Sequence, residues 1–147
     1  MLIVVGASGG LGSHLVKKMA GDHQIIGTYN NTQPPPDSGA RMMHRVDVTD
    51  SDSVRRFVRE VGGTVERIVL VYMAGISLDG MGHKMKEDIW DRVVQTNLKG
   101  CFLMSQAFLP LMREQGWGRI INISSIAGAM GALLNRNRSV EGRADSV

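Results

Sequence analysis

The chain has 147 residues, of which 43% are hydrophobic and 21% are charged, and its formal net charge is +3 at pH 7. These values are typical of one soluble globular domain, and the absence of an apolar run of about 18 residues or of a signal-peptide pattern predicts a cytoplasmic protein with no membrane partner. The single cysteine, Cys101, excludes an intramolecular disulfide and gives no support for a metal site. The thinly spread charge and the 5% aromatic content argue against a nucleic-acid partner.

Short apolar segments, most of them rich in β-branched residues, recur along the chain and predict strands. They span residues 2–5, 24–29, 42–48, 67–73 and 119–124. Residues 30–39 lie between the second and third of these segments and contain three consecutive prolines, which predict a surface loop.

Segments with helical spacing of apolar residues alternate with the strands. The first helix is predicted to carry its apolar stripe at Leu11, Leu15, Val16 and Met19. After the third strand, Asp50 or Ser51 can cap a helix whose apolar face is made by Val54, Phe57, Val58 and Val61. The longest helical stretch covers residues 86–114, where Gly100 and Pro110 predict a kink or a division into two helices.

This alternation of strands and helices determines the expected fold class. Consecutive parallel strands require right-handed crossovers, so the pattern predicts an α/β fold with an open parallel sheet and helices on both faces. In such a doubly wound sheet, ligands bind at the carboxyl ends of the strands.

A glycine-rich segment, residues 6–12, joins the first predicted strand to the first predicted helix. Its glycines can form a tight turn and let a pyrophosphate approach the N-terminus of the helix, although such a turn also occurs as a purely structural connection. The candidate cofactor-binding residues in this segment are Gly6, Ser8, Gly9, Gly10, Leu11 and Gly12.

The spacing G-x-x-x-G-x-G in this segment resembles the cofactor loop of the short-chain dehydrogenases/reductases, and further motifs match that family in order over residues 2–131. The likeness is strongest to bacterial 3-oxoacyl-acyl-carrier-protein reductases of fatty acid biosynthesis. It implies a Rossmann-like sheet of about five strands in the order 3-2-1-4-5, with residues 1–131 forming a partial NAD(P)-binding domain. It also implies hydride transfer between NADPH and a carbonyl such as a 3-oxoacyl thioester, of small-molecule or acyl-carrier form, in a homo-oligomer.

Two further motifs match cofactor-contacting segments of the family. Asp47-Val48 resembles the pair that contacts the adenine, although the acid could instead cap the following helix. Ala74-Gly75 resembles the end of the family's Asn-Asn-Ala-Gly segment, which lies along the cofactor ribose. Tyr72 and Met73 stand at the two asparagine positions, so a backbone contact can survive here while the asparagine side-chain bonds cannot.

Two residues match catalytic positions of the family. Asn97 resembles the asparagine that bends the long helix and holds a water for proton relay, and its alternative is a solvated position on a helix face. Ser125 resembles the serine that donates a hydrogen bond to the substrate carbonyl, and its alternative is a serine that completes a turn.

The resemblance breaks down where the family has its tyrosine and lysine, which together protonate the substrate oxygen. At the family spacing from Ser125 these residues fall at positions 138 and 142, where this chain has Arg138 and Gly142. An arginine is a poor proton donor because it stays protonated, and glycine has no side chain.

The residues after Asn137 can be encoded by a sequence in which two inserted bases restore a tyrosine at 138 and a lysine at 142. We therefore expect a frameshift near Arg138, an irregular out-of-frame tail at residues 132–147, a truncated sheet, impaired oligomerisation and an inactive chain. The alternatives are a natural divergent tail, a non-catalytic dinucleotide-binding module and a nonfunctional gene product.

The end of the second predicted strand bears on the choice of cofactor. NAD sites place an acid there, whereas this chain has Tyr29 and Asn30, which can accept a 2′-phosphate. Gly9 stands where many NADPH-using relatives have an arginine, which leaves Arg41 as a distant candidate for the phosphate. We expect NADP(H) to be favoured over NAD(H) by about fivefold.

Overall fold

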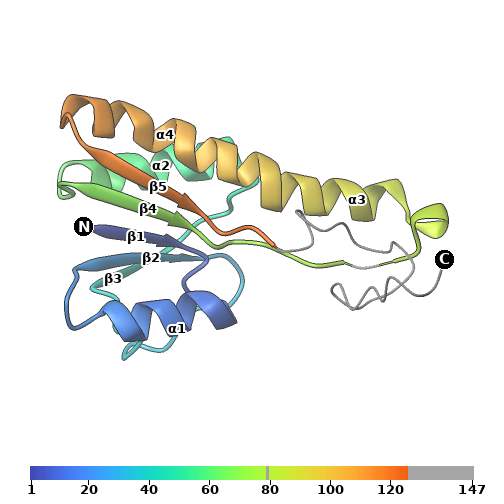
Figure 1. Ribbon diagram of the computed structural model, residues 1–147, viewed down its shortest axis with the longest axis horizontal. Coiled ribbons are helices and arrows are strands. Elements are labelled where there is room, and N and C mark those ends of the chain that lie inside the picture. The colour runs from blue at the N-terminus through green and yellow to red at the C-terminus, as the bar shows by residue number, and fades with distance from the viewer. Residues whose placement is uncertain (79, 126–147) are drawn as a thin grey trace, which may run out of the picture.

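The computed structural model describes residues 1–78 and 80–125, in which five strands form one parallel sheet. The strands run in the order β3-β2-β1-β4-β5, as expected from the sequence (Figure 1). Their bounds are β1 Leu2–Val5, β2 Ile25–Tyr29, β3 Met42–Arg45, β4 Ile68–Tyr72 and β5 Gly118–Asn122. All carboxyl ends therefore lie at the same edge of the sheet, to the right in Figure 1.

Helices cover both faces of this sheet. Helix α1, Gly10–Met19, packs on one face, while α2, Ser51–Gly62, and α4, Gly100–Glu114, pack on the other (Figure 1). A short 3₁₀ turn, Gly82–Lys84, and helix α3, Glu87–Val94, precede α4. This arrangement confirms the expected doubly wound α/β fold.

The long helical stretch is divided by a π-turn at Gln95–Lys99, which joins α3 to α4. The sequence predicted a kink or a division into two helices, and the division occurs at this turn, directly before Gly100; Pro110 lies inside α4 without interrupting it. A π-turn of this kind widens the helix locally and occurs frequently at functional sites.

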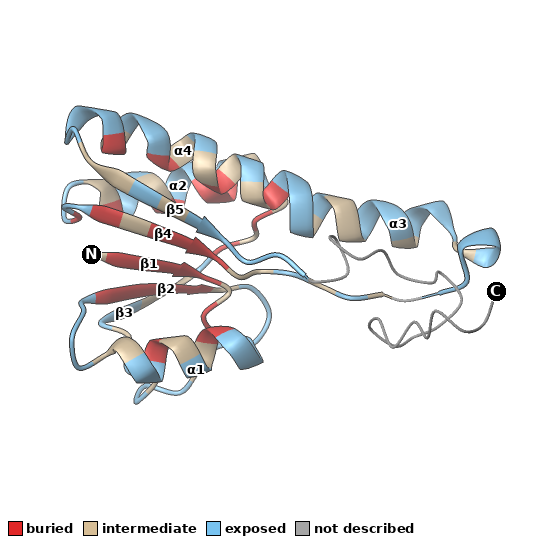
Figure 2. Ribbon diagram, in the orientation of Figure 1, coloured by how far each residue is buried: buried red, intermediate tan, exposed pale blue. Residues whose placement is uncertain are grey.

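The inner strands are buried on both faces, which explains their continuous apolar sequences (Figure 2). On the α2 and α4 side, Phe57 and Phe108 are fully buried and meet edge to face, with 5.9 Å between their ring centroids. Burial of each such side chain contributes about 1.5–3 kcal/mol. On the α1 side, Val16 packs against Leu2, Val4 and Ile25.

Two expectations from the sequence need correction. The third strand ends at Arg45 rather than at residue 48: the amide of Val46 still donates to the carbonyl of Tyr29, the last residue of β2, and the chain then turns at Asp47, whose Oδ1 accepts from the amide and the hydroxyl of Thr49. Leu11 does not belong to the core stripe of α1, since 71% of it is exposed. Leu11 therefore lies on the solvent side of the first turn of α1, whereas Gly12 in the same turn is buried, and Val16 is the most deeply buried apolar residue of this helix.

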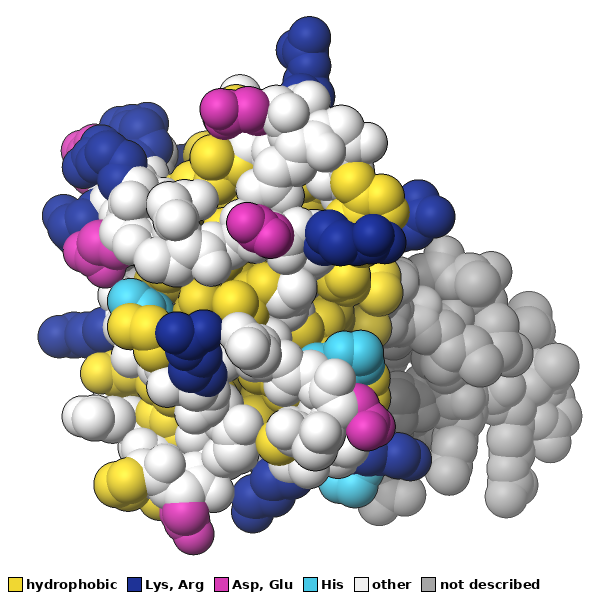
Figure 3. All heavy atoms as spheres, turned by 90° about the vertical axis from the view of Figure 1, so that its left-hand side faces the viewer, with side chains coloured by type: hydrophobic (Ala, Val, Ile, Leu, Met, Phe, Trp, Pro, Cys, Tyr) yellow, Lys and Arg dark blue, Asp and Glu magenta, His cyan; other side chains and the backbone are white. Residues whose placement is uncertain are grey.

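Several large apolar side chains remain exposed in the described part of the chain. They are Leu11, Met42, Met81, Trp90, Leu98, Phe102, Leu109, Ile121 and Ile123. Figure 3 shows the edge of the sheet opposite the strand carboxyl ends, where basic and acidic side chains are interspersed and do not gather into a patch of one sign. Among the residues described, no helix has the length and hydropathy needed to cross a membrane.

Substitution of Gly12 by alanine tests the close packing at the start of α1. A Cβ at this position would overlap the carbonyl oxygen of Gly6 and lie 2.9 Å from the Cα of Ala7, so we expect Gly12→Ala to lower the free energy of unfolding by about 1–3 kcal/mol. Gly10→Ala is the matched control, because a Cβ at Gly10 meets nothing within 4 Å. Equal urea-unfolding midpoints for the two variants would contradict this packing.

Candidate cofactor site

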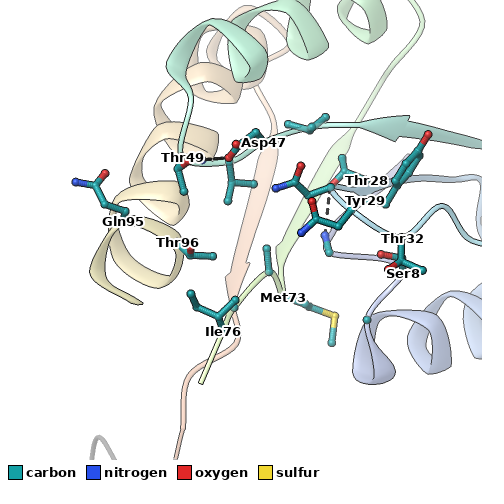
Figure 4. A pocket seen from close by; sticks show the side chains of 18 of the residues that line it. Ser8, Thr28, Tyr29, Thr32, Asp47, Thr49, Met73, Ile76, Gln95 and Thr96 are labelled. Carbon is teal, nitrogen blue, oxygen red and sulfur yellow. Dashed lines mark hydrogen bonds between the residues drawn. The ribbon is translucent and has the colours of Figure 1, made fainter. Parts of the chain in front are cut away.

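A cavity of about 770 Å³ opens at the carboxyl edge of the sheet, above β1, β2 and β4 (Figure 4). This is the point at which the strand order reverses, since β2 and β4 lie on opposite sides of β1. Its volume is within the usual range of small-molecule sites, about 300–1,000 Å³. The fold thus places the cavity where doubly wound sheets bind ligands.

The glycine loop forms one wall of this cavity. Gly6 has a φ of +84°, and a Cβ there would lie 2.8 Å from the backbone of Ala74, so only glycine fits between the ends of β1 and β4. The amide of Gly6 donates to Thr28 Oγ1 at 3.2 Å, and the amide of Ala7 donates to the Thr28 carbonyl at 2.8 Å. The end of β2 therefore holds the loop in place.

The N-terminus of α1 is suited to an anion. Gly9 is its N-cap and supplies no side-chain cap, and the first turn contains no acidic residue. The first amides of a helix have no intrahelical acceptor and carry the positive end of the helix dipole. A pyrophosphate that approaches Gly9 would meet these amides.

Asp47 lies at the opposite wall, after β3. Its Oδ1 accepts hydrogen bonds from the amide and the hydroxyl of Thr49, at 2.9 and 2.7 Å. The N-cap of α2 is Asp50, which accepts from the amide of Asp52 at 2.9 Å. Asp47 therefore closes the turn before the helix and is not the helix cap that its sequence context also allowed.

The loop after β4 forms the third wall and is tied to the π-turn by Asn97. The side-chain oxygen of Asn97 accepts from the amide of Ile76 at 2.9 Å, and its Nδ2 donates to the Ile76 carbonyl at 3.0 Å. The side chain of Asn97 thus pairs with both polar groups of one residue. It acts on the cavity through Ile76, since Asn97 itself is not among the lining residues.

Most of the cofactor-binding residues expected from the sequence line this one cavity. They are Gly6, Ser8, Gly9, Tyr29, Asn30, Asp47, Val48, Ala74 and Gly75. The remaining candidates, Gly10, Leu11 and Gly12, lie in the first turn of α1 and do not line it. Ser125 is the last residue of the described range and does not line it either, while positions 138 and 142 lie outside that range.

Other lining residues were not singled out from the sequence as cofactor contacts. They are Thr28, Asn31, Thr32, Val46, Thr49, Met73, Ile76, Asp91, Arg92, Gln95 and Thr96. Several follow strand ends, where the fold rule could have found them. Asp91, Arg92, Gln95 and Thr96 carry no such signal, because only the packing of α3 and the π-turn brings them to the cavity.

The two family asparagine positions have separate roles in this chain. Met73 lines the cavity (Figure 4). Tyr72 instead directs its hydroxyl toward the π-turn, where it donates to the Thr96 carbonyl at 2.5 Å. Burial raises the pKa of Tyr72 far above its ordinary value, and Cys101 nearby adds to the shift, so this hydroxyl stays protonated.

Comparison with known proteins identifies the family. The model of the short chain dehydrogenase family matches residues 1–136. This chain belongs to the short-chain dehydrogenase family. Nodulation protein G of Azospirillum brasilense is 34% identical over 150 residues, which cover 93% of this chain and 60% of that protein. The 3-oxoacyl-acyl-carrier-protein reductase of Staphylococcus aureus strain Mu50 is 33% identical over 140 residues, which cover 88% of this chain and 57% of that protein.

Solved structures support the same assignment. Serine dehydrogenase from Escherichia coli has a TM-score of 0.74 at 29% identity, over 87% of this chain and 63% of that chain. ElxO with NADP bound has a TM-score of 0.78 at 25% identity, over 89% of this chain and 57% of that chain. This short-chain dehydrogenase therefore spans about three fifths of the length of the relatives that it matches.

The structure corrects the cation suggested for a 2′-phosphate. Arg41 Nη1 donates to Gln24 Oε1 at 2.9 Å, next to the start of β2 and therefore at the edge opposite the cavity. Arg45 lies at the correct edge, since it pairs with Tyr29 in the sheet and its Nε donates to the Asn30 carbonyl at 3.1 Å. Strand order thus brings Arg45, and not Arg41, to the end of β2.

Removal of the Thr28 hydroxyl tests how the glycine loop is held. Thr28→Val keeps the branched shape but leaves the amide of Gly6 without its side-chain acceptor, so we expect a loss of about 1–2 kcal/mol in the free energy of unfolding. Thr28→Ser retains the hydroxyl and should keep most of the stability. Equal urea-unfolding curves for these two variants would show that this bond does not hold the loop.

Proposed function

We propose that this chain binds a nicotinamide dinucleotide at the carboxyl-edge cavity and favours NADP(H) over NAD(H). One observation carries the proposal: Gly6, Ser8 and Gly9, together with residues 47–48 and 74–75, match separate cofactor segments of the family and line the same cavity. The bound NADP of the structural neighbour ElxO supports the choice of ligand.

Each wall has a role in this proposal. The glycine loop and the N-terminus of α1 receive the pyrophosphate, Asp47 and Val48 contact the adenine, and the backbone of Ala74 and Gly75 lies along a ribose. A bound NADPH would supply a hydride to a carbonyl, for which the reductase relative suggests a 3-oxoacyl thioester. Ser125 would donate a hydrogen bond to that carbonyl.

We further propose that the chain as written binds the cofactor without reducing a carbonyl. Arg138 and Gly142 occupy the positions of the tyrosine and lysine that supply the proton. Of the two tyrosines in the chain, Tyr72 donates its hydroxyl to Thr96, and Tyr29 lies at the end of β2. General acid catalysis contributes about 10²–10⁴-fold, so its loss removes most of the rate.

A frameshift near Arg138 is the proposed origin of this departure. Sequencing of the gene across codons 134–147 decides between a shifted frame and a natural divergent tail. If two bases are missing after the codon for Asn137, their re-insertion restores the tyrosine at 138 and the lysine at 142. A gene sequence in which no two-base change yields both residues would contradict the frameshift.

Cofactor binding and turnover should separate in this chain. We expect titration with NADPH, followed by nicotinamide fluorescence, to saturate, while NADPH oxidation in the presence of a 3-oxoacyl thioester stays at the uncatalysed rate. The frame-restored protein is the matched control and should gain about 10²-fold or more in rate. Absence of NADPH binding by the folded chain would favour a nonfunctional gene product. Robust turnover by the 147-residue chain would contradict the assignment of proton transfer to a tyrosine at 138 and a lysine at 142.

The preference for NADP(H) should depend on Arg45. Its guanidinium lies beside Asn30, so we expect Arg45→Ala to weaken NADPH binding by about five- to tenfold and to leave NADH binding within about twofold. Arg41→Ala is the matched control and should change neither affinity, because Arg41 bonds to Gln24 at the opposite edge. Equal losses for NADPH and NADH in Arg45→Ala would contradict a 2′-phosphate contact.

A further inference from the structure

Tyr72 joins the central sheet to the π-turn beside the cavity. It is the last residue of β4, and only 3% of it is exposed. Its hydroxyl donates to the carbonyl of Thr96, within the turn that separates α3 from α4. The next residue after Thr96 is Asn97, whose side chain binds the amide and the carbonyl of Ile76. A continuous chain of contacts therefore runs from β4 through the π-turn to the cavity wall.

Gly100 provides the space for this contact. A Cβ at Gly100 would overlap the hydroxyl oxygen of Tyr72 and would lie 2.9 Å from Cγ2 of Val48. Glycine at the first position of α4 therefore lets the helix approach the end of β4 closely enough for the tyrosine to reach the Thr96 carbonyl. The large residue at 72 and the absent side chain at 100 form a complementary pair.

We propose that Tyr72 is a positioning residue of the cofactor site, whose hydroxyl holds the π-turn so that Asn97 engages Ile76. The tyrosine acts through Thr96 and Asn97, since Tyr72 does not line the cavity whereas Thr96 and Ile76 do. It stands where the family pattern has an asparagine, so this chain sets the position of the wall by a different contact.

The hydroxyl is well suited to a permanent structural bond. Burial raises the pKa of Tyr72, with a smaller contribution from Cys101, so the hydroxyl donates throughout the physiological pH range. Thr96 is half-buried, and a carbonyl that loses its donor in such a place costs free energy. Loss of this one hydroxyl should therefore loosen the π-turn more than the rest of the fold.

Amide hydrogen exchange of Tyr72→Phe tests the proposal without requiring cofactor. We expect exchange at the Ile76 amide to accelerate at least about tenfold relative to amides of β1. Val61→Ala is the matched control, because Val61 is buried on α2 in the same core cluster, and its truncation lowers global stability without removing the bond to Thr96. If the exchange rate at the Ile76 amide changed only as far as the loss of global stability explains, and did so equally in both variants, the positioning role would be overturned.

Gly100→Ala is a second variant that leaves Tyr72 in place. Its new methyl group would overlap the Tyr72 hydroxyl, so we expect faster exchange at the Ile76 amide. We also expect Gly100→Ala to lower the free energy of unfolding less in a chain that already carries Tyr72→Phe than in the unaltered chain. Additive losses of stability in the double variant would contradict the pairing of residues 72 and 100.

A cofactor titration links this role to the proposed function, on which it then rests. We expect NADPH affinity to fall about three- to tenfold in Tyr72→Phe and to stay unchanged in Val61→Ala. If the unaltered chain bound no NADPH, the proposed function would fail, while hydrogen exchange at Ile76 would still decide the role of Tyr72. Unchanged affinity in Tyr72→Phe alongside faster exchange would overturn its role in the site.

Discussion

The close approach of backbone segments at the carboxyl ends of β1 and β4 is the constraint on which the candidate site depends. Gly6 lies against the backbone of Ala74, and Gly12 lies against the carbonyl of Gly6, so a side chain at either glycine would push these segments apart. Because the strand order reverses here, the gap between the loops opens toward solvent and forms the cavity. Glycine is thus required here because it has no side chain and, at Gly6, because it adopts a positive φ.

The fold was largely predictable because its information is local. Buried parallel strands such as β1 are continuously apolar, and the alternation of strands and helices leaves few topologies. The ends of elements were harder to predict, because they depend on single hydrogen bonds. The third strand stops early because the chain turns at Asp47, whose carboxylate accepts from the amide and the hydroxyl of Thr49, and no periodicity in the sequence predicts these bonds.

The candidate site was predictable where residues follow a strand end and not where tertiary packing brings residues to it. Gly6, Asp47 and Gly75 could be found from motif and order, whereas Thr96 reaches the cavity only through the π-turn. Arg41 was a reasonable candidate by its place in the sequence. The parallel register moves it to the opposite edge and brings Arg45 to the end of β2, which a one-dimensional pattern does not show.

The three cavity walls include Gly6, Ser8 and Gly9, residues 47–48 and residues 74–76, all within the described part of the chain, while the positions proposed for proton transfer lie at 138 and 142. Binding and proton transfer are thus carried by separate stretches of the sequence, and binding is the central claim. Amide chemical-shift mapping of the ¹⁵N-labelled chain during NADPH titration tests it most directly. We expect saturable shifts at Gly6, Ser8, Gly9 and Gly75, and none at His23 on the opposite edge. Shifts confined to that opposite edge, or no shifts at saturating NADPH, would contradict a cofactor site at the point where the strand order reverses.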